Sequence, residues 1–131
     1  MERTKVEIVQ AQIAAINQGD TDAMLENLAP DFEFDMSRSV GPDNGVYGLD
    51  QMLSWNERIQ DSWESITIEA QEFLERGDDI VVPWIWRVRG RDEIEVEARV
   101  TIVFTIRDGV IARACMYQSR QDALDAIGAA E

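Results

Sequence analysis

The side chains that could perform acid–base chemistry in this sequence are mainly carboxylates, because the chain contains no histidine. This absence removes Ser-His-Asp and Cys-His catalysis, histidine-based metal sites and the commonest general base near neutral pH. Asp35 is the candidate catalytic base, because it follows Phe32 and Phe34 and apolar surroundings raise the pKa of a carboxyl group. The two phenylalanines occupy even positions of the predicted strand and Asp35 an odd one, so they point to opposite faces. The alternatives are that Asp35 is solvated or that it holds the following loop.

Three further polar side chains are candidates for ligand contacts. Arg38 could bind an anionic group of a substrate, although a structural ion pair with Asp35 is the more common outcome for such a pair. Gln12 could hold a ligand carbonyl or be solvated on its helix. Tyr47 could close a pocket or simply pack at the end of its loop.

Metal and thiol chemistry are not expected. Glu93, Glu95 and Glu97 alternate like a metal-binding row, but carboxylates of like charge without other ligands are more typical of a solvated strand face. Cys115 is the single cysteine, which excludes an internal disulfide and fits a reducing compartment. No cationic neighbour of Cys115 is evident in the sequence, so a reactive thiol is not predicted. We expect no metal and no cofactor.

Residues 80–119 are the scaffold that must position these side chains. Apolar residues occupy the even positions from Ile80 to Val88 and again from Ile94 to Ile106, and this period of two is typical of strands with one buried face. Asp108-Gly109 predicts a hairpin turn, because both residues tolerate positive φ. A third strand follows from Val110 to Ser119. The three strands are predicted to form an antiparallel meander with one apolar face.

Helical patterns precede this meander. Thr4 and Glu7 form a capping box, and Gly19 ends the helix that follows. The remaining predicted elements are a short helix capped by Asp20 or Thr21 and ending at Ala29-Pro30, a strand over 31–36, a loop over 37–47, a helix from Gly48-Leu49-Asp50, a strand over 66–71, a turn at 76–78 and a helix over 121–130. This order predicts an α+β fold, a curved and mostly antiparallel sheet wrapped around three N-terminal helices, in one domain over residues 1–131.

Composition restricts the partners. The 131 residues carry 26 acidic and 12 basic side chains, for a net charge of −14, so nucleic acid and anionic membrane surfaces are not expected partners. No apolar run approaches the ~20 residues of a membrane span. The N-terminal residues lead into an amphipathic segment and lack the apolar core of a signal peptide. We therefore expect a cytoplasmic protein.

Short sequence blocks along nearly the whole chain form a further pattern. They are AINQGD at 15–20, LAPDFEFD at 28–35, YGLD at 47–50, EFLERGD at 72–78 and RDGVIARACMY at 107–117, followed by DAL at 122–124. Together they resemble the nuclear transport factor 2-like superfamily, specifically its ketosteroid-isomerase-like and SnoaL-like members. The resemblance implies a conical α+β barrel, usually dimeric, with the ligand between the concave sheet face and the helices. The superfamily contains isomerases, cyclases, dehydratases, epoxide hydrolases and non-catalytic binders.

The catalytic residues of these families transfer poorly onto this chain. Steroid isomerases pair an Asp base with a Tyr and a neutral carboxylic acid. The base position falls at Asp35 or, on an equally good alignment, at Met36, the Tyr position falls at Gln12 and the acid position at Ile102. Authentic steroid isomerisation is therefore not predicted. The Asp-Arg-Asp set of the epoxide hydrolases is missing from the even strand faces, and the dehydratases need a histidine.

The resemblance also assigns the even strand faces to an apolar pocket. The expected lining is Ile16, Met52, Trp55, Ile59, Val82, Trp84, Trp86, Val100, Ile102, Phe104, Ala114, Met116 and Gln118. Trp84 and Trp86 offer flat walls for an aromatic or polycyclic ligand, unless they only fill the core. Our first expectation is an isomerase-like or cyclase-like protein that uses Asp35 without a cofactor. The alternatives are a non-catalytic binder of a hydrophobic small molecule and a dimeric accessory domain with a filled cavity.

The odd face of the same strands combines apolar residues with arginines. Its members are Pro83, Ile85, Arg87, Val103, Arg113, Cys115 and Tyr117. Such a mixture suits a subunit interface, and we expect a homodimer through this outer face of the sheet. The alternative is that the C-terminal helix covers it.

Overall fold

The computed structural model describes residues 4–38, 45–90, 92 and 94–128. In chain order its elements are α1 (Lys5–Gln18), α2 (Thr21–Glu26), β1 (Leu28–Asp35), β2 (Val46–Gly48), α3 (Leu49–Ser62), β3 (Ser65–Ala70), β4 (Leu74–Arg76), β5 (Asp79–Arg89), β6 (Glu95–Arg107), β7 (Val110–Tyr117) and α4 (Arg120–Ala126). No helix in this described part is long and apolar enough to cross a membrane.

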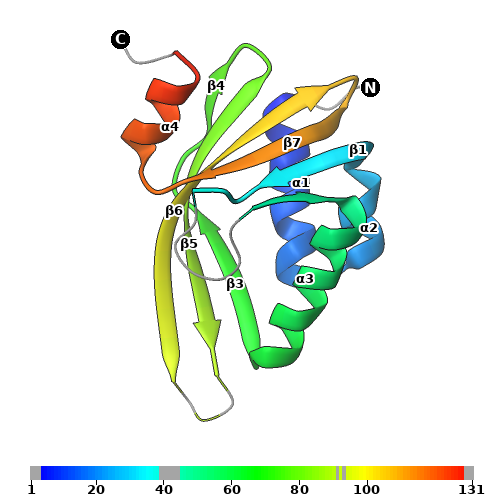
Figure 1. Ribbon diagram of the computed structural model, residues 1–131, viewed down its shortest axis with the longest axis vertical. Helices are drawn as coiled ribbons and strands as arrows, with labels where there is room; N and C mark the ends of the chain where they lie inside the picture. Colours follow the sequence, from blue (N-terminus) through cyan, green and yellow to red (C-terminus); the bar gives the residue numbers. More distant parts are fainter. Residues whose placement is uncertain (1–3, 39–44, 91, 93, 129–131) are drawn as a thin grey trace.

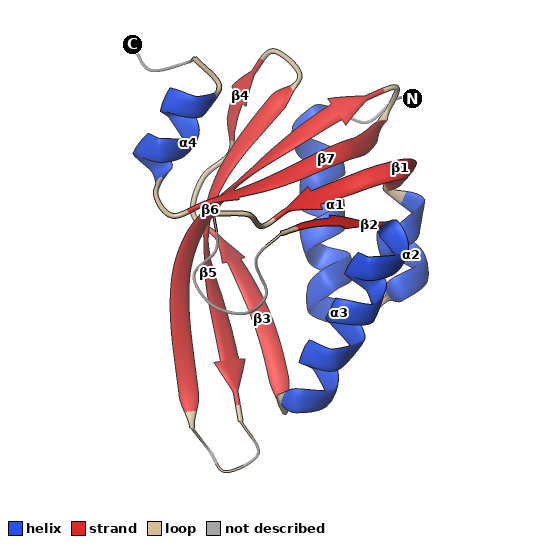
Figure 2. Ribbon diagram, viewed as in Figure 1, coloured by secondary structure: helices blue, strands red, loops and turns tan. Residues whose placement is uncertain are grey.

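The strands form one curved sheet in the order β2-β1-β7-β6-β5-β3, and β4 pairs with β5 at one end (Figure 1). The pairs are antiparallel except for β1 and β7, which run parallel. The described sheet stays open. Helices α1, α2 and α3 lie on its concave side, whereas α4 lies on the other side (Figure 2). The predicted α+β class and the curved sheet around the N-terminal helices are confirmed.

Several predicted local signals are present. Thr4 accepts a hydrogen bond from the Glu7 amide and Glu7 accepts one from the Thr4 amide, which completes the capping box. Gly19 ends α1 with φ +68°. Asp108 and Gly109 form the turn between β6 and β7 with φ of 55° and 80°. These elements follow from local sequence because each depends on side chains within a few residues.

The short strands differ from expectation. Val46–Gly48 was expected at the end of a loop and the start of a helix but pairs with β1 as β2. Leu74–Arg76 lies beside the predicted turn and pairs with β5 as β4. Strands of three residues are too short for an alternating pattern to identify them. Helix α2 also ends earlier than predicted, at Glu26, and β1 already begins at Leu28.

Two apolar layers hold the sheet. The inner cluster lies between the concave face and helices α1 and α3, and it contains the even-numbered side chains of β5 and β6. The smaller outer cluster lies under α4, where Ala123 and Leu124 cover Val81, Val103 and Cys115. The alternation predicted for the long strands therefore places even and odd residues on opposite faces.

Candidate functional site

Asp35 lies on the outer face of the sheet. In the parallel pair of β1 and β7, Phe34 is opposite Ala114 and Asp35 is opposite Cys115. Phe34 and Ala114 belong to the inner cluster and Cys115 to the outer one. The inward position next to Asp35 is taken by Met36, which is 1% exposed. A role for Asp35 as a base in the Trp-lined face therefore finds no support in this geometry.

The Asp35 carboxylate is held by several donors. Arg113 donates from Nη2 to Oδ2 at 2.8 Å, and Ser37 donates to Oδ1 from its hydroxyl at 2.6 Å and its amide at 3.0 Å. Arg38 Nη1 lies 3.7 Å from Asp35 Oδ2, so the ion pair that the sequence suggested between these two residues is present. Burial alone would raise the pKa of Asp35, but the hydrogen bonds from Ser37 and the charges of Arg113 and Arg38 outweigh it and lower the pKa. A carboxylate with a lowered pKa is a poor general base at neutral pH.

Arg38 connects several residues of the outer face. Its Nη1 donates to Cys115 Sγ at 3.3 Å, its guanidinium carbon lies 4.7 Å from the centre of the Tyr117 ring, and its carbonyl accepts from Gln118 Nε2 at 2.7 Å. Burial, together with the neighbouring Cys115, raises the pKa of Tyr117 to about 12. Cys115 thus has a cationic neighbour that the sequence could not reveal, because Arg38 is 77 positions away.

A hollow of about 460 Å³ adjoins this group, lined by Arg38, Tyr117, Gln118, Asp122, Asp125 and Ala126. Gln118, which was expected in the concave pocket, lies here with Arg38. The two polar candidates Arg38 and Gln118 are therefore neighbours beside α4.

The expected apolar lining gathers on the concave face. Seven of the expected residues are buried in the inner cluster, namely Met52, Val82, Trp84, Ile102, Phe104, Ala114 and Met116. Four more pack against it while partly exposed, namely Ile16, Trp55, Trp86 and Val100. The side chain of Ile59 lies outside the described residues. The structure thus brings together the described apolar residues of the predicted pocket, from α1, α3, β5, β6 and β7.

Aromatic rings form a continuous series through this cluster. Phe34 and Trp55 meet edge to face with centroids 6.2 Å apart, and Trp55 meets Trp86 in the same way at 6.3 Å. Trp86 contacts Trp84 at 5.8 Å, and Trp84 contacts Phe104 at 5.9 Å. Contacts at such distances and angles are favourable. The series runs from β1 across α3 to β5 and β6, so it spans the concave face.

Two polar atoms in this series have no partner. The indole Nε1 atoms of Trp55 and Trp84 are buried, and no group in the described part of the chain accepts a hydrogen bond from either. Trp84 is only 4% exposed. A buried donor without an acceptor costs about 1–3 kcal/mol, so such groups call for an explanation.

Gln12 and Tyr47 take structural positions. Gln12 is 4% exposed, and its Oε1 accepts a hydrogen bond from Asn27 Nδ2 at 3.1 Å. The Asn27 carbonyl in turn accepts from the Ile111 amide at 2.8 Å. Gln12 is therefore buried, in contrast to the solvated alternative, and links α1 to the start of β1. Tyr47 is half-buried and packs against the inner cluster.

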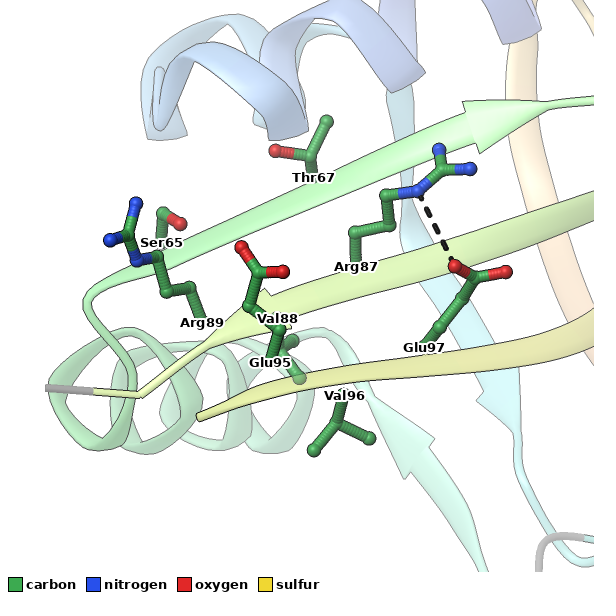
Figure 3. A pocket seen from close by; sticks show the side chains of 8 residues that line it. All are labelled: Ser65, Thr67, Arg87, Val88, Arg89, Glu95, Val96 and Glu97. Carbon is green, nitrogen blue, oxygen red and sulfur yellow. Dashed lines mark ion pairs between the residues drawn. The ribbon is translucent and has the colours of Figure 1, made fainter. Parts of the chain in front are cut away.

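A larger hollow, of about 490 Å³, lies on the polar face of β3, β5 and β6 (Figure 3). Arg87 donates to Glu69 at 2.6 Å and lies 3.7 Å from Glu97, which lies 3.2 Å from Arg99. Figure 3 shows the Arg87–Glu97 pair, with Val96 pointing away from it. Because these charges neutralise one another and are exposed, this surface is a poor site for an apolar ligand.

The structure describes the surroundings of part of the glutamate row. Glu97 pairs with arginines, and Glu93 lies outside the described part of the chain. The described residues contain no group of three or more acidic, cysteine or histidine side chains that could hold a metal ion.

The outer face offers fewer residues to a partner than the sequence suggested. Val103, Cys115 and Tyr117 are buried in the cluster that α4 covers through Ala123 and Leu124. For these three residues the alternative prediction is correct, because the C-terminal helix α4 covers them. A homodimer through the rest of this face stays a prediction.

Comparison with known proteins places this geometry in a family. Residues 9–114 match the family described as the SnoaL-like domain. By sequence, no curated protein matches the chain. The match and the solved structures confirm the predicted resemblance to ketosteroid-isomerase-like and nuclear transport factor 2-like proteins.

Three solved structures illustrate the likeness. TerC, co-crystallised with polyporic acid, has a TM-score of 0.76 and 19% identity over 95% of this chain and 98% of its own. A hypothetical protein with a ketosteroid isomerase-like fold from Catenulispora acidiphila, in complex with trimethylamine, has a TM-score of 0.74 and 18% identity, covering 95% of each chain. A putative polyketide cyclase from Xanthomonas campestris pv. campestris has a TM-score of 0.70 and 21% identity over 92% of this chain and 94% of its own. At these identities the likeness concerns the fold.

Proposed function

The chain belongs to the SnoaL-like domain family, and on this premise we propose that it binds an apolar, ring-containing small molecule on the concave face of its sheet. Flat aromatic walls favour flat ligands, because ring contacts add to the burial of apolar area. Two members of the aromatic series, Trp55 and Trp86, are only half-buried. A ligand would reach the series from this side, between α3 and β5.

The observation that carries the proposal is the unpartnered Nε1 of Trp84. A ligand oxygen, such as a carbonyl or phenolic oxygen, would accept the hydrogen bond that the protein leaves unmade. The same holds for Trp55, which is joined to Trp84 through Trp86. We therefore propose an oxygen-bearing ring compound as the ligand class.

Binding without carboxylate catalysis is the function that the geometry favours. Among the described residues Asp35 is the one buried residue with a charged side chain, and it faces away from the aromatic series. An isomerase or cyclase that uses Asp35 is the second candidate. The likeness to a putative polyketide cyclase favours it, and it requires Asp35 to leave Arg113 and Ser37.

The test compares two ligands and two variants by equilibrium binding. Naphthoquinone carries carbonyl oxygens, and methylnaphthalene has similar rings without them. Trp84→Phe keeps an aromatic ring and removes the N–H. We expect Trp84→Phe to weaken the affinity for naphthoquinone roughly tenfold, which is the value of one hydrogen bond. The affinity for methylnaphthalene should stay the same as in the wild-type protein, because this ligand has no oxygen to accept a hydrogen bond.

Trp63→Phe is the matched control, because Trp63 lies outside the aromatic series. Thermal unfolding of each variant verifies the fold. If Trp84→Phe lost the same affinity for both ligands, Trp84 would contribute packing to the binding but no hydrogen bond. The absence of binding of either ligand to the wild-type protein would reject the proposal.

A further inference from the structure

Thr101 of β6 is a buried residue whose hydroxyl group has no hydrogen-bond partner. It is only 2% exposed. The other buried polar or charged residues of the described chain are Gln12, Asn27 and Asp35, and each makes a side-chain hydrogen bond. Nothing in the described part of the chain bonds to the Thr101 hydroxyl. Burial of a hydroxyl without a partner is unfavourable, so this residue calls for an explanation.

Thr101 lines a hollow of about 200 Å³ on the face that carries the odd-numbered residues of β5 and β6. Its neighbour across the strands, Pro83 of β5, lines the same hollow, and so does Ile85. These two residues give the hollow an apolar wall. In the described residues, the unpartnered side-chain atoms that are completely enclosed are indole nitrogens, so the Thr101 hydroxyl is accessible from the hollow.

An ion pair joins the two sides of this hollow. Arg120, at the start of α4, donates from Nε to Glu72, which lies between β3 and β4. Gln71, next to Glu72 in the chain, lines the hollow together with Arg120. The hollow is therefore bounded by β5 and β6 below and by polar side chains at both sides.

The lining of the hollow carries two positive charges and no negative one. Its arginines are Arg99 and Arg120. Other hollows of the described chain include acidic side chains, which are Glu95 and Glu97 in one, Asp122 and Asp125 in another, and Glu57 and Asp61 in a third. In a chain with a net charge of −14, a lining with this positive balance favours an anion.

Both arginines keep donors for a ligand. Arg99 bonds to Glu97 through Nη2, and Arg120 bonds to Glu72 through Nε. A guanidinium group has five N–H donors, so each arginine can donate to a second acceptor. The four side chains are between 39% and 72% exposed. Ion pairs between exposed side chains are weak, so they do not prevent an anion from binding.

We propose that this hollow binds the carboxylate group of a small organic acid. The Thr101 hydroxyl donates to a carboxylate oxygen, and Arg99 and Arg120 neutralise the charge, since a guanidinium group matches the geometry of a carboxylate. Pro83 and Ile85 contact the apolar part of the acid. The hollow is smaller than the ~300–1,000 Å³ of sites for drug-sized ligands, so the acid is small. This site is separate from the aromatic series of the concave face.

An NMR titration of the isotope-labelled protein tests the class of ligand. Butyrate carries a carboxylate, and butyramide has a similar shape without the charge. We expect butyrate to shift the backbone amide signals of Arg99, Thr101 and Arg120, and butyramide to bind roughly tenfold more weakly or worse. Inorganic phosphate is the second anion. Equal affinities for butyrate and butyramide would overturn the proposal. Tighter binding of phosphate than of butyrate would also overturn it, in favour of a general anion site.

Two threonine variants separate ligand binding from stability. Thr101→Val removes a hydroxyl that has no partner, so it should not lower the melting temperature, yet it should weaken butyrate binding roughly tenfold. Thr105→Val is the matched control on the same strand. The Thr105 hydroxyl donates to Asp79 at 2.7 Å, and Thr105 does not line the hollow. This control should lower the melting temperature and leave butyrate binding unchanged.

The role of the positive charge is tested with Arg120→Gln. This variant should weaken butyrate binding and leave the weak binding of butyramide as it is. Arg107→Gln, an exposed change at the other end of β6, should change neither. A wild-type protein that does not bind butyrate would overturn the proposal, and so would an affinity for butyrate that Thr101→Val leaves unchanged. Naphthoquinone binding is measured separately, so either result leaves the proposal for the concave face intact.

Discussion

Phe34 and Asp35 are consecutive residues of β1, yet they serve opposite faces of the sheet. Phe34 contacts Trp55 edge to face at 6.2 Å, whereas Asp35 accepts a hydrogen bond from Arg113 at 2.8 Å. The first residue belongs to the aromatic series that we propose binds a ligand. The second belongs to a charged group that stabilises the outer face. Because adjacent residues of a strand point to opposite sides, the two roles are physically separate.

The first prediction concerns the stability that Asp35 provides. Asp35→Asn removes the charge that Arg113 and Arg38 neutralise and weakens the bonds from Ser37. The free energy of unfolding should fall by about 1.5–3 kcal/mol at neutral pH, the range for hydrogen bonds to charged groups. Urea unfolding measures this difference. Asp31→Asn, an exposed change on the same strand, is the control.

The same substitution predicts a pH dependence. The pKa of Asp35 is lowered in the folded protein, so its stabilisation is fully present above the unfolded pKa of about 3.9 and disappears as the pH falls through the folded value. The difference in unfolding free energy between wild type and Asp35→Asn should therefore be largest above about pH 4. It should shrink as the pH falls further and Asp35 of the folded protein becomes protonated. A difference that stays constant down to strongly acidic pH would contradict the assignment.

The second prediction concerns the cover that α4 provides. Leu124 is buried against the outer cluster that includes Cys115. Leu124→Ala should lower the free energy of unfolding by about 2–3 kcal/mol and speed the reaction of the Cys115 thiol with a thiol reagent. Asp125→Ala, an exposed change on the same helix, should do neither. An unchanged rate of thiol modification in Leu124→Ala would show that α4 does not protect Cys115.

The third prediction concerns the turn between β6 and β7. Gly109 has φ +80°, and an added Cβ would meet no atom within 4 Å. Gly109→Ala should therefore cost about 1 kcal/mol through backbone strain alone. At Gly48 the φ is ordinary and a Cβ would make a normal contact with Gln51, so Gly48→Ala should be close to neutral. Thermal unfolding compares the two, and equal effects would contradict the turn geometry.

The sequence predicts what depends on near neighbours or on alternation. The capping box at Thr4, the Asp108-Gly109 turn and the even face that carries Trp84 all follow from local pattern. The alternation also indicated that the side chains of Phe34 and Asp35 would lie on opposite faces of the sheet, although the family resemblance favoured Asp35 as a base. What the sequence could not provide are contacts between distant residues. The pair of Asp35 and Arg113 spans 78 positions, and Arg38 reaches Cys115 over 77.

The unpartnered indole groups were also beyond sequence analysis. Whether Trp84 Nε1 meets an acceptor depends on α3 and on the neighbouring strands together. The alternation of β5 predicts only that the ring is buried.

The measurement that tests the central claim most directly is the NMR signal of the indole N–H groups during a titration with naphthoquinone. The four tryptophans are Trp55, Trp63, Trp84 and Trp86. Binding on the concave face with new hydrogen bonds should move the Trp55 and Trp84 signals most and leave Trp63 nearly unchanged, in both the wild type and Asp35→Asn. Signals of Trp55 and Trp84 that stay in place throughout the titration, or a response lost in Asp35→Asn, would contradict the account.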